Sequence, residues 1–295
     1  MKLVIAGGSG HLGRQLIRAF EQRGAQVTVL SRRVSAEAHA VAWDGQSLGS
    51  WRREVDGADA VINLAGRSVN CRYSAANLRV MLNSRVASTR TIGQAIEQAA
   101  NPPRVWLQMS TATIYAHRFD AENDEWTGRI GGDEPDTPSL WRNSMEIAKA
   151  WEEALHQANT PTTRKVALRT AMVMSAEPGG VFEVLARLTR LGLGGPIAGG
   201  RQFVSWIHYY DFVRAMEFLL ERNDIDGAVN IAAPKPLPQR EFMAALRKAM
   251  RVKIGLPATK WMLELGTFAP SHRVRAGAEE PPRRASAAAR CRVQL

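Results

Sequence analysis

Seven residues close to the N-terminus constrain the fold of this chain more than any other segment. They read Gly7-Gly8-Ser9-Gly10-His11-Leu12-Gly13, follow an apolar run at residues 3–6 and open an amphipathic pattern over residues 12–23. In a strand–turn–helix unit, the first glycine permits a tight turn, the second lets a pyrophosphate approach the backbone, and the third allows close packing of helix on strand. The helix N-terminus presents free N–H groups to phosphates. The segment therefore predicts a dinucleotide-binding unit of the Rossmann type.

The end of the second expected strand indicates which dinucleotide is bound. An acidic side chain at this place accepts hydrogen bonds from the ribose 2′-hydroxyl of NAD. This chain instead reads Ser31-Arg32-Arg33. A hydroxyl and two planar guanidinium groups suit a 2′-phosphate, so the sequence predicts NADP(H) as the cofactor. The alternative is a solvated pair of surface arginines.

Short apolar runs alternate with amphipathic segments along the first 175 residues. This alternation predicts an α/β fold in which helices cover both faces of a doubly wound parallel sheet. We expect a Rossmann domain over residues 1–175, a smaller substrate lobe over 176–268 that interleaves with the sheet, and a ligand cleft between them. The expected strands are residues 3–6, 26–30, 58–64, 104–109 and 165–173, and the expected helices are residues 12–23, 75–98, 144–157, 211–221 and 239–251.

Composition narrows the classes of partner. The net charge of +11 includes six arginines and only two glutamates in residues 267–295, and no basic run is interleaved with aromatic residues. Nucleic-acid binding is therefore not expected, whereas a mildly basic body suits small anions. No run approaches the roughly 18 apolar residues of a membrane span, and the run after Met1 is too short for a signal peptide. We expect a cytoplasmic protein, and its oligomeric state stays open.

Metal and disulfide chemistry are not expected either. The two cysteines, Cys71 and Cys291, have no neighbours at metal-ligand spacing. The last segment, residues 269–295, follows neither a helical nor a strand pattern, and one interpretation is an aberrant or disordered basic tail. A second interpretation is a frameshift near residue 270. Codons that encode residues 274–285 can, one nucleotide out of phase, read Ser-Glu-Leu-Val-Leu-Lys-Ser-Arg-Arg-Val-Val-Pro, an ordinary amphipathic segment. Sequencing of the gene would test this.

Several motifs together resemble the extended short-chain dehydrogenases/reductases. They are the glycine motif, Asn63-Leu64-Ala65-Gly66, Ser110-Thr111-Ala112-Thr113-Ile114-Tyr115 and Ile207-His208-Tyr209-Tyr210-Asp211. Three further segments are similar to an atypical, epimerase-like subfamily whose members are described as sugar-nucleotide epimerases. These are Leu191-Gly192-Leu193-Gly194-Gly195-Pro196, Gly200-Arg201-Gln202 and Ser205-Trp206-Ile207-His208. The resemblance covers residues 1 to about 268 and implies an NADP(H)-binding Rossmann fold.

The resemblance also implies roles for particular residues. The turn at Asn63, Leu64, Ala65 and Gly66 would line the adenine and ribose side of the cofactor. Thr111, with Ser110 as the alternative, would hydrogen-bond the reacting oxygen of the substrate, although either could simply end a strand. Tyr115 would face the substrate cleft and is the candidate to polarise the reacting oxygen together with Thr111.

The catalytic pair departs from the family pattern. Active members carry Tyr-x-x-x-Lys on one helical face, where the lysine lowers the pKa of the tyrosine and holds the nicotinamide ribose. At the matching spacing this chain has Met145 and Lys149. A thioether cannot transfer a proton, so the usual mechanism is lost. Lys149 is expected to remain in the cofactor site.

The end of the strand at residues 165–173 and the C-terminal lobe offer candidates for the substrate site. Arg169 and Arg201 are expected to bind a substrate anion, and the glycine-rich stretch 192–200 to form a flap or merely a turn. His208 is a further substrate-binding candidate, or a structural hydrogen-bonding group. Asp211 is expected to cap the helix that follows it.

Two functions of different classes remain open at the level of sequence. One is an NADP-dependent oxidoreductase or epimerase-like enzyme that acts on a small carbonyl or hydroxyl substrate, with a nucleotide sugar as one candidate. The other is a non-catalytic NADP(H)-binding or redox-sensing module, which the missing tyrosine favours. The fold alone does not decide between them.

Overall fold

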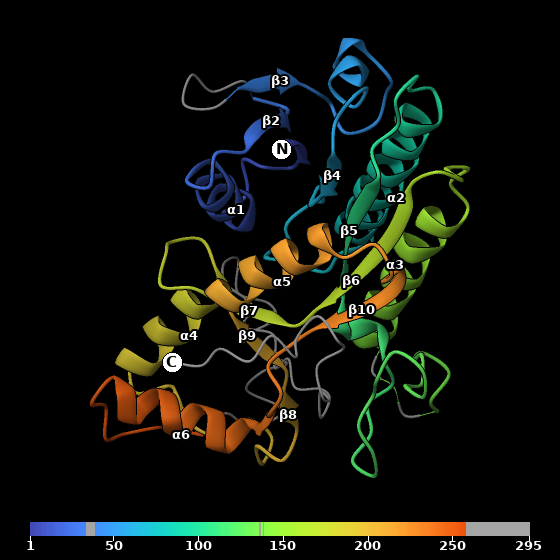
Figure 1. Ribbon diagram of the computed structural model, residues 1–295. Helices are drawn as coiled ribbons and strands as arrows, with labels where there is room; N and C mark the ends of the chain where they lie inside the picture. Colours follow the sequence, from blue (N-terminus) through green and yellow to red (C-terminus); the bar gives the residue numbers. More distant parts are fainter. Residues whose placement is uncertain (34–38, 136, 138, 258–295) are drawn as a thin grey trace.

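The computed structural model describes residues 1–33, 39–135, 137 and 139–257, and it is built around one parallel sheet (Figure 1). The sheet has seven strands in the order β10-β6-β5-β4-β1-β2-β3, and every neighbouring pair is parallel. This order confirms the expected doubly wound α/β fold. The strands are β1 (Lys2–Ala6), β2 (Gln26–Ser31), β3 (Ala40–Ala42), β4 (Ala60–Asn63), β5 (Val105–Thr111), β6 (Arg164–Thr170) and β10 (Gly227–Ile231).

Helices cover both faces of this sheet because successive strand residues point to opposite sides. In β1, Leu3 and Ile5 pack with helices α1 (His11–Glu21) and α5 (Tyr209–Glu221). Val4 and Ala6 instead pack on the other face, with α2 (Ala75–Glu97), α3 (Ser139–His156) and the 3₁₀ turn η1 (Ser50–Glu54). All four of these β1 side chains are fully buried. Burial on both faces explains why the strands read as continuous apolar runs.

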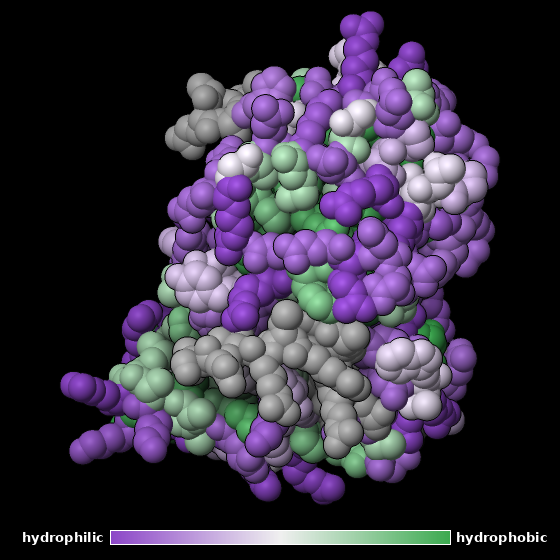
Figure 2. All heavy atoms as spheres, in the orientation of Figure 1, coloured by the Kyte–Doolittle hydropathy of each residue, from purple (hydrophilic) through white to green (hydrophobic). Residues whose placement is uncertain are grey.

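A smaller lobe extends from the carboxyl ends of the strands. It contains a parallel pair, β7 (Met172–Met174) with β9 (Trp206–His208), and an antiparallel pair, β8 (Phe203–Val204) with β11 (Leu237–Pro238). Helices α4 (Val181–Arg190) and α6 (Gln239–Ala249) pack on each other through an apolar cluster that includes Leu185 and Met243. Apolar residues gather over these two helices on the face shown in Figure 2.

The expected elements differ from the structure mainly after residue 140. The expected strand 165–173 is two strands, because β6 ends at Thr170 and β7 begins at Met172. Helix α3 begins five residues before the expected start, and α5 begins at Tyr209 rather than Asp211. β10 was not expected at all. Both β10 and α5 lie after residue 175 but belong to the main sheet and its cover. The division of the chain at residue 175 therefore stays a prediction.

Asp211 is not the cap of α5, contrary to the expectation from sequence. His208 occupies the N-cap position with an extended backbone, and its side chain accepts a hydrogen bond from the backbone N–H of Tyr210. Asp211 lies in the first turn, where its charge still complements the helix dipole. The predictions for the apolar stretch 261–265 and for the tail at 269–295 fall outside the described residues.

Candidate functional site

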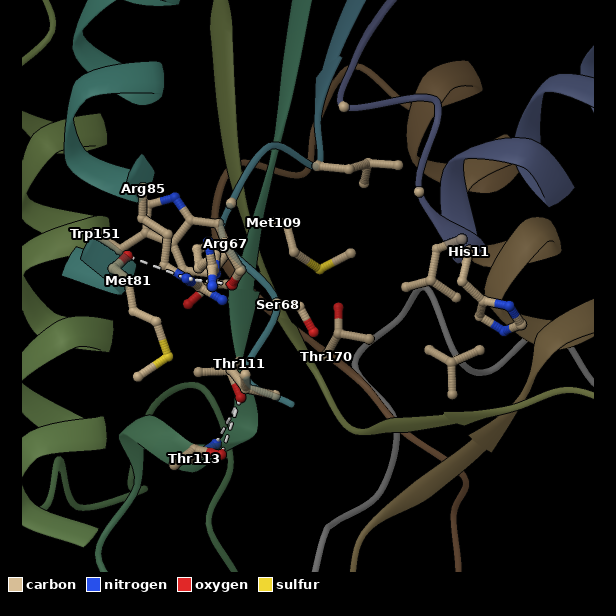
Figure 3. A pocket seen from close by; sticks show the side chains of 18 of the residues that line it. His11, Arg67, Ser68, Met81, Arg85, Met109, Thr111, Thr113, Trp151 and Thr170 are labelled. Carbon is tan, nitrogen blue, oxygen red and sulfur yellow. Dashed lines mark hydrogen bonds between the residues drawn. The ribbon is translucent and has the colours of Figure 1, made fainter. Parts of the chain in front are cut away.

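A cleft of roughly 430 Å³ opens at the carboxyl ends of β1, β4, β5 and β6. The glycine loop and the start of α1 form one side, and residues of α2 and α3 form the other (Figure 3). This is the edge of an open α/β sheet at which ligands characteristically bind. The volume lies within the range of small-molecule sites.

The glycine loop has little room for side chains. A Cβ atom on Gly7, whose φ is +77°, would lie 2.9 Å from the backbone of Ala65. A Cβ on Gly8 would press on the side chain of Val29, and one on Gly13 would overlap the backbone of Gly8. The absence of side chains lets the β1–α1 turn lie against β4 and lets α1 approach the sheet closely.

The N-terminus of α1 opens into the cleft. Its N-cap residue is Gly10, which makes no side-chain capping hydrogen bond, and the first turn contains no acidic residue. His11, Leu12 and Gly13 of this turn line the cleft. An α-helix start with exposed N–H groups and a positive dipole end is suited to bind a phosphate. The geometry thus fits the pyrophosphate of a dinucleotide.

The end of β2 lies beside the glycine loop, as the sequence led us to expect. The hydroxyl of Ser31 donates to the hydroxyl of Ser9 over 3.1 Å and accepts from the backbone N–H of Arg33. Arg32 and Arg33 are exposed. The structure therefore brings two hydroxyl groups together beside the glycine loop, and the exposed Arg32 and Arg33 follow directly in the chain.

The turn after β4 is held by a buried amide. Asn63 is fully buried, donates to Oε1 of Gln108 over 2.9 Å and accepts from the backbone N–H of Ala65 over 3.0 Å. Asn63 thus shapes the turn and does not itself reach the cleft. Leu64 and Gly66 do line the cleft.

Hydroxyl groups gather where β5 ends. The hydroxyl groups of Thr111 and Thr113 lie 3.0 Å apart, and Oγ1 of Thr111 also accepts from the backbone N–H of Thr113. Both residues line the cleft, together with Ser144 and Thr170 (Figure 3 shows Thr111, Thr113 and Thr170). Oγ1 of Thr111 accepts one hydrogen bond, so the hydroxyl of Thr111 can donate its own proton to Oγ1 of Thr113. The hydroxyl proton of Thr113 can then point into the cleft. The arrangement can hydrogen-bond a substrate oxygen.

The face of α3 that lines the cleft is not the one expected. Ser144, Ile147, Ala148 and Trp151 line it, whereas Met145 and Lys149 do not. Met145 is fully buried, and its sulfur lies against Gly131. Nζ of Lys149 lies beside Gly132, 3.1 Å from where a Cβ of that glycine would be. The positions four apart that face the cleft are therefore Ser144 and Ala148, and the placement of Lys149 in the cofactor site stays a prediction.

Behind the cleft, a buried polar network joins β5, β6 and α3. Glu152 accepts from the hydroxyl of Ser110 over 2.6 Å and from Nε and Nη2 of Arg169 over 3.0 and 2.8 Å. Nη1 of Arg169 donates to the hydroxyl of Tyr115 over 2.9 Å, and that hydroxyl donates to Oδ1 of Asn230 over 2.8 Å. Burial acts to lower the pKa of Arg169, but the hydrogen bonds and charge of Glu152 raise it above its ordinary value.

This network contains two residues that the sequence singled out for the substrate. Tyr115 is only 1% exposed and is absent from the cleft lining. Arg169 uses its guanidinium on Glu152 and Tyr115 in the interior. Their roles towards the substrate stay predictions. Within this network, Ser110 is the residue that borders the cleft. Sequence spacing could not reveal the pairing of Glu152 with Arg169, because the two lie 17 residues apart on a helix and a strand.

We expect Tyr115 to make stability fall in alkali. Burial raises the pKa of Tyr115 to about 12, against the opposing effects of Arg169 and Asn230. Between about pH 10 and 12 the unfolded chain loses this proton while the folded one keeps it, so unfolding becomes easier as pH rises. A shift of that size corresponds to about 3 kcal/mol at full effect. In urea denaturation, the free energy of unfolding of the wild type should fall more steeply above about pH 9 than that of Tyr115→Phe. Identical pH slopes would contradict it.

The candidates in the small lobe lie apart from the cleft. Arg201 is exposed, and its guanidinium carbon lies 5.9 Å from the ring centre of Phe119. His208 is exposed and caps α5. Neither lines the cleft, so their substrate-binding roles stay predictions. In the glycine-rich stretch, Gly192, Gly199 and Gly200 have positive φ and form turns.

The structure adds cleft residues that the sequence did not single out. Arg85 of α2 and Trp151 of α3 both line the cleft, and the guanidinium carbon of Arg85 lies over the ring of Trp151, 4.9 Å from the ring centre. They lie on different helices, and neither belongs to a recognisable motif. Among the described residues, no helix is long and apolar enough to cross a membrane, and no group of three or more His, Cys, Asp or Glu side chains could hold a metal ion.

Comparisons with known proteins agree with this geometry. The model of the "NAD dependent epimerase/dehydratase family" matches residues 3–232. The "Epimerase family protein SDR39U1" of Bos taurus is 31% identical over 254 residues, which are 85% of this chain and 81% of that protein. The crystal structure of human epimerase family protein SDR39U1 (isoform2) with NADPH has a TM-score of 0.79 at 28% identity, covering 90% of this chain and 85% of that one.

A more distant structure shares the fold alone. The UDP-glucuronic acid 4-epimerase of Bacillus cereus, in complex with UDP-glucuronic acid and NAD, has a TM-score of 0.75 at 15% identity. That match covers 98% of this chain and 92% of the other. The likeness extends over the small lobe as well as the sheet.

Proposed function

The chain belongs to the NAD dependent epimerase/dehydratase family, and from this premise we propose that its cleft binds NADP(H) and serves hydride transfer to or from a small carbonyl or hydroxyl substrate. The observation that carries the proposal is the glycine loop 7–13, in which a Cβ at Gly7 or Gly13 would meet the backbone of Ala65 or Gly8 and the start of α1 has no capping side chain. The similarity to a human protein crystallised with NADPH supports the same cofactor. A cytoplasmic location stays part of this proposal.

The phosphate end of the cofactor is assigned to residues that carry its charge. The α1 N-terminus would bind the pyrophosphate, while Ser31, Arg32 and Arg33 would bind the 2′-phosphate. Bound NADP(H) would supply a hydride or accept one. All residues of this set come from the N-terminal β-α-β unit.

The reacting oxygen would be held by hydroxyl groups. Thr111 and Thr113 lie within 3.0 Å of each other at the cleft, and Ser144 lines the facing helix. A donated hydrogen bond stabilises the negative charge that develops on an oxygen during hydride transfer. Ser110 is held by Glu152 and would keep the end of β5 in place. Substrate polarisation would thus rely on threonine and serine rather than on a tyrosine–lysine pair.

A second candidate function is a redox-sensing module that binds NADP(H) without turnover. The positions of α3 that face the cleft carry Ser144 and Ala148, so the helix presents neither a phenol nor an ammonium group there. Transfer of deuterium from stereospecifically labelled NADPH into a metabolite mixture discriminates the two. The enzyme predicts transfer from one face of the nicotinamide, and the sensor predicts none.

Cofactor choice provides the direct test of the proposal. Titration of the protein with NADPH and NADH, followed by cofactor fluorescence, should show at least about tenfold tighter binding of NADPH. In the double variant Arg32→Ala/Arg33→Ala, charge-assisted bonds to the 2′-phosphate are lost. The affinity for NADPH should therefore fall about 10- to 100-fold, while the affinity for NADH should stay within about twofold of the wild type.

The matched control is Arg53→Ala, an exposed arginine of η1 that does not line the cleft. It should bind both nucleotides like the wild type. Failure of the wild type to bind either nucleotide would refute the proposal. Equal weakening of NADPH and NADH in the double variant would remove the assignment of the 2′-phosphate to these arginines.

A further inference from the structure

The loop between β7 and α4 reaches from the small lobe to the start of α1. We call its residues 175–180 the strap. Gly179 and Gly180 of the strap line the cleft, together with the glycine loop and His11. Figure 3 shows the imidazole of His11 at the edge of this cavity. The strap therefore borders the space that the proposed function gives to the pyrophosphate.

The imidazole of His11 joins the strap to α1. Its Nδ1 lies 3.0 Å from the carbonyl oxygen of Pro178, and its Nε2 lies 2.9 Å from Nε2 of Gln15. A carbonyl oxygen only accepts and an amide nitrogen only donates, so the ring hydrogen is on Nδ1 and is donated to Pro178. Gln15 is buried, and its amide fixes the orientation of the ring from the interior. His11 thus makes a directed hydrogen bond between α1 and the small lobe.

The strap has no room for a side chain at Gly180. A Cβ atom there would lie 2.7 Å from Nε2 of His11. The φ of Gly180 is −95°, which any residue adopts, so the requirement for glycine comes from the close approach of the imidazole. The ring cannot yield freely, because a hydrogen bond holds each of its nitrogens. The imidazole and the strap are therefore packed against each other as well as hydrogen-bonded.

A second contact attaches the strap to the same helix. Nη1 of Arg18, two turns after His11, forms an ion pair with Oε1 of Glu177 over 2.7 Å. Both side chains are partly exposed, so this pair stabilises the contact less than a buried one would. Within the loop, Oε2 of Glu183 accepts from the backbone N–H of Gly179 over 2.7 Å. The strap therefore has a defined shape, and the bond from His11 is its main directed link to α1.

Resting on the proposed function, we propose that the strap is the second wall of the NADP(H) site and that His11 is the residue that positions this wall. The glycine loop holds the pyrophosphate from one side, and Gly179 and Gly180 cover it from the other. A wall without side chains at these two positions approaches the phosphates closely and excludes water. Exclusion of water strengthens the attraction between the phosphates and the α1 N-terminus. The small lobe thereby takes part in binding the cofactor.

The test compares two substitutions that both remove the contact with Gln15. His11→Asn keeps an N–H group near the place of Nδ1, whereas His11→Phe keeps a ring of similar size without a donor. NADPH titrations of the full chain, followed by cofactor fluorescence, measure the affinities. His11→Phe should bind NADPH about five- to tenfold more weakly than the wild type, because the hydrogen bond that holds the wall is lost. His11→Asn should stay within about threefold of the wild type.

Hydrogen–deuterium exchange reports on the strap itself. Saturating NADP⁺ should slow the exchange of the amides at residues 179–184 about tenfold in the wild type and in His11→Asn. In His11→Phe at saturation, these amides should exchange as fast as without the cofactor, while those at residues 7–13 are still slowed. A histidine with a merely structural role would leave this difference between the two segments unchanged.

Two further variants separate the wall from general effects of substitution. His156→Phe makes the same exchange at an exposed histidine, the last residue of α3, outside the cleft, and should bind NADPH like the wild type. Gly180→Ala, whose Cβ would meet the imidazole, should weaken NADPH about as much as His11→Phe does. Thermal midpoints show that each variant is folded.

Several results would overturn the inference. They are equal NADPH affinity in the wild type, His11→Phe and Gly180→Ala, equal weakening in His11→Asn and His11→Phe, or strap amides that NADP⁺ protects in His11→Phe as in the wild type. If NADP⁺ protects residues 7–13 of the wild type but not residues 179–184, the inference fails and the proposed function stands. If the wild type binds neither NADP⁺ nor NADPH, the proposed function fails and the inference falls with it.

Discussion

Gly13→Ala should abolish most NADPH binding, with an affinity loss of about 100-fold or more, which corresponds to about 2.8 kcal/mol. In an ordinary helix, alanine would be the better residue by up to about 1 kcal/mol. Here the new Cβ would overlap the backbone of Gly8, which has no flexible side chain to yield. Helix α1 must then move away from the β1–α1 turn, and its N-terminus leaves the position that suits the pyrophosphate. Fluorescence titration with NADPH measures the effect.

Gly57→Ala is the matched control for this substitution. Gly57 has a φ of +68°, and an added Cβ would meet no atom within 4 Å, so alanine there brings backbone strain without overlap. Its N–H donates to the carbonyl of Asn101, outside the cleft. The expected cost is about 1–2 kcal/mol of stability with unchanged NADPH affinity. NADPH affinity within about twofold of wild type in Gly13→Ala would show that the glycine loop does not form the cofactor site.

Glu152→Gln should lower the free energy of unfolding by about 3–5 kcal/mol, because it leaves the charge of Arg169 buried without its carboxylate. The exposed fractions of the Arg169 and Glu152 side chains are only 11% and 6%, and two hydrogen bonds join the groups. The amide keeps the shape of the carboxyl group but turns an N–H group towards the guanidinium or towards Ser110. Urea denaturation at pH 7 measures the loss.

Glu153→Gln provides the comparison at the next position of the same helix. Glu153 is exposed, and Oε1 accepts a hydrogen bond from Gln157. Its replacement should change stability by no more than about 0.5 kcal/mol. If the two variants were equally stable, the buried pair would contribute nothing specific. If Glu152→Gln also weakened NADPH binding while still folded, Ser110 would transmit the disturbance to the end of β5.

The N-terminal half of the fold and its glycine loop could be predicted from the sequence. Residues 7–13 carry the requirement for glycine locally, because the turn and the helix start are made of neighbouring residues. The buried strands indicate a parallel sheet through their continuous apolar runs. The end of β2 could be located because the apolar run that leads to it ends there. All these features depend on residues that are close in sequence.

The tertiary structure decided which side chains meet at the cleft. Successive residues of a helix are rotated by about 100°, so Ser144 and Ala148 line the cleft while the next positions, Met145 and Lys149, do not. The phase of the helix is set by the packing of α3 on the sheet and on the segment around Gly131, which lies outside the helix.

The same reason applies to Arg169 and Arg85. In the sequence, Arg169 is a lone arginine near the end of a strand, and Arg85 is a lone arginine within a helix. Glu152 holds one in the interior, and Trp151 holds the other against the cleft wall. The sequence by itself determined the fold class and the cradle for a dinucleotide, since those follow from local backbone requirements. Only the packing of α2, α3 and β6 decided which charges are paired in the interior and which face the cleft, because burial and pairing depend on partners distant in the chain.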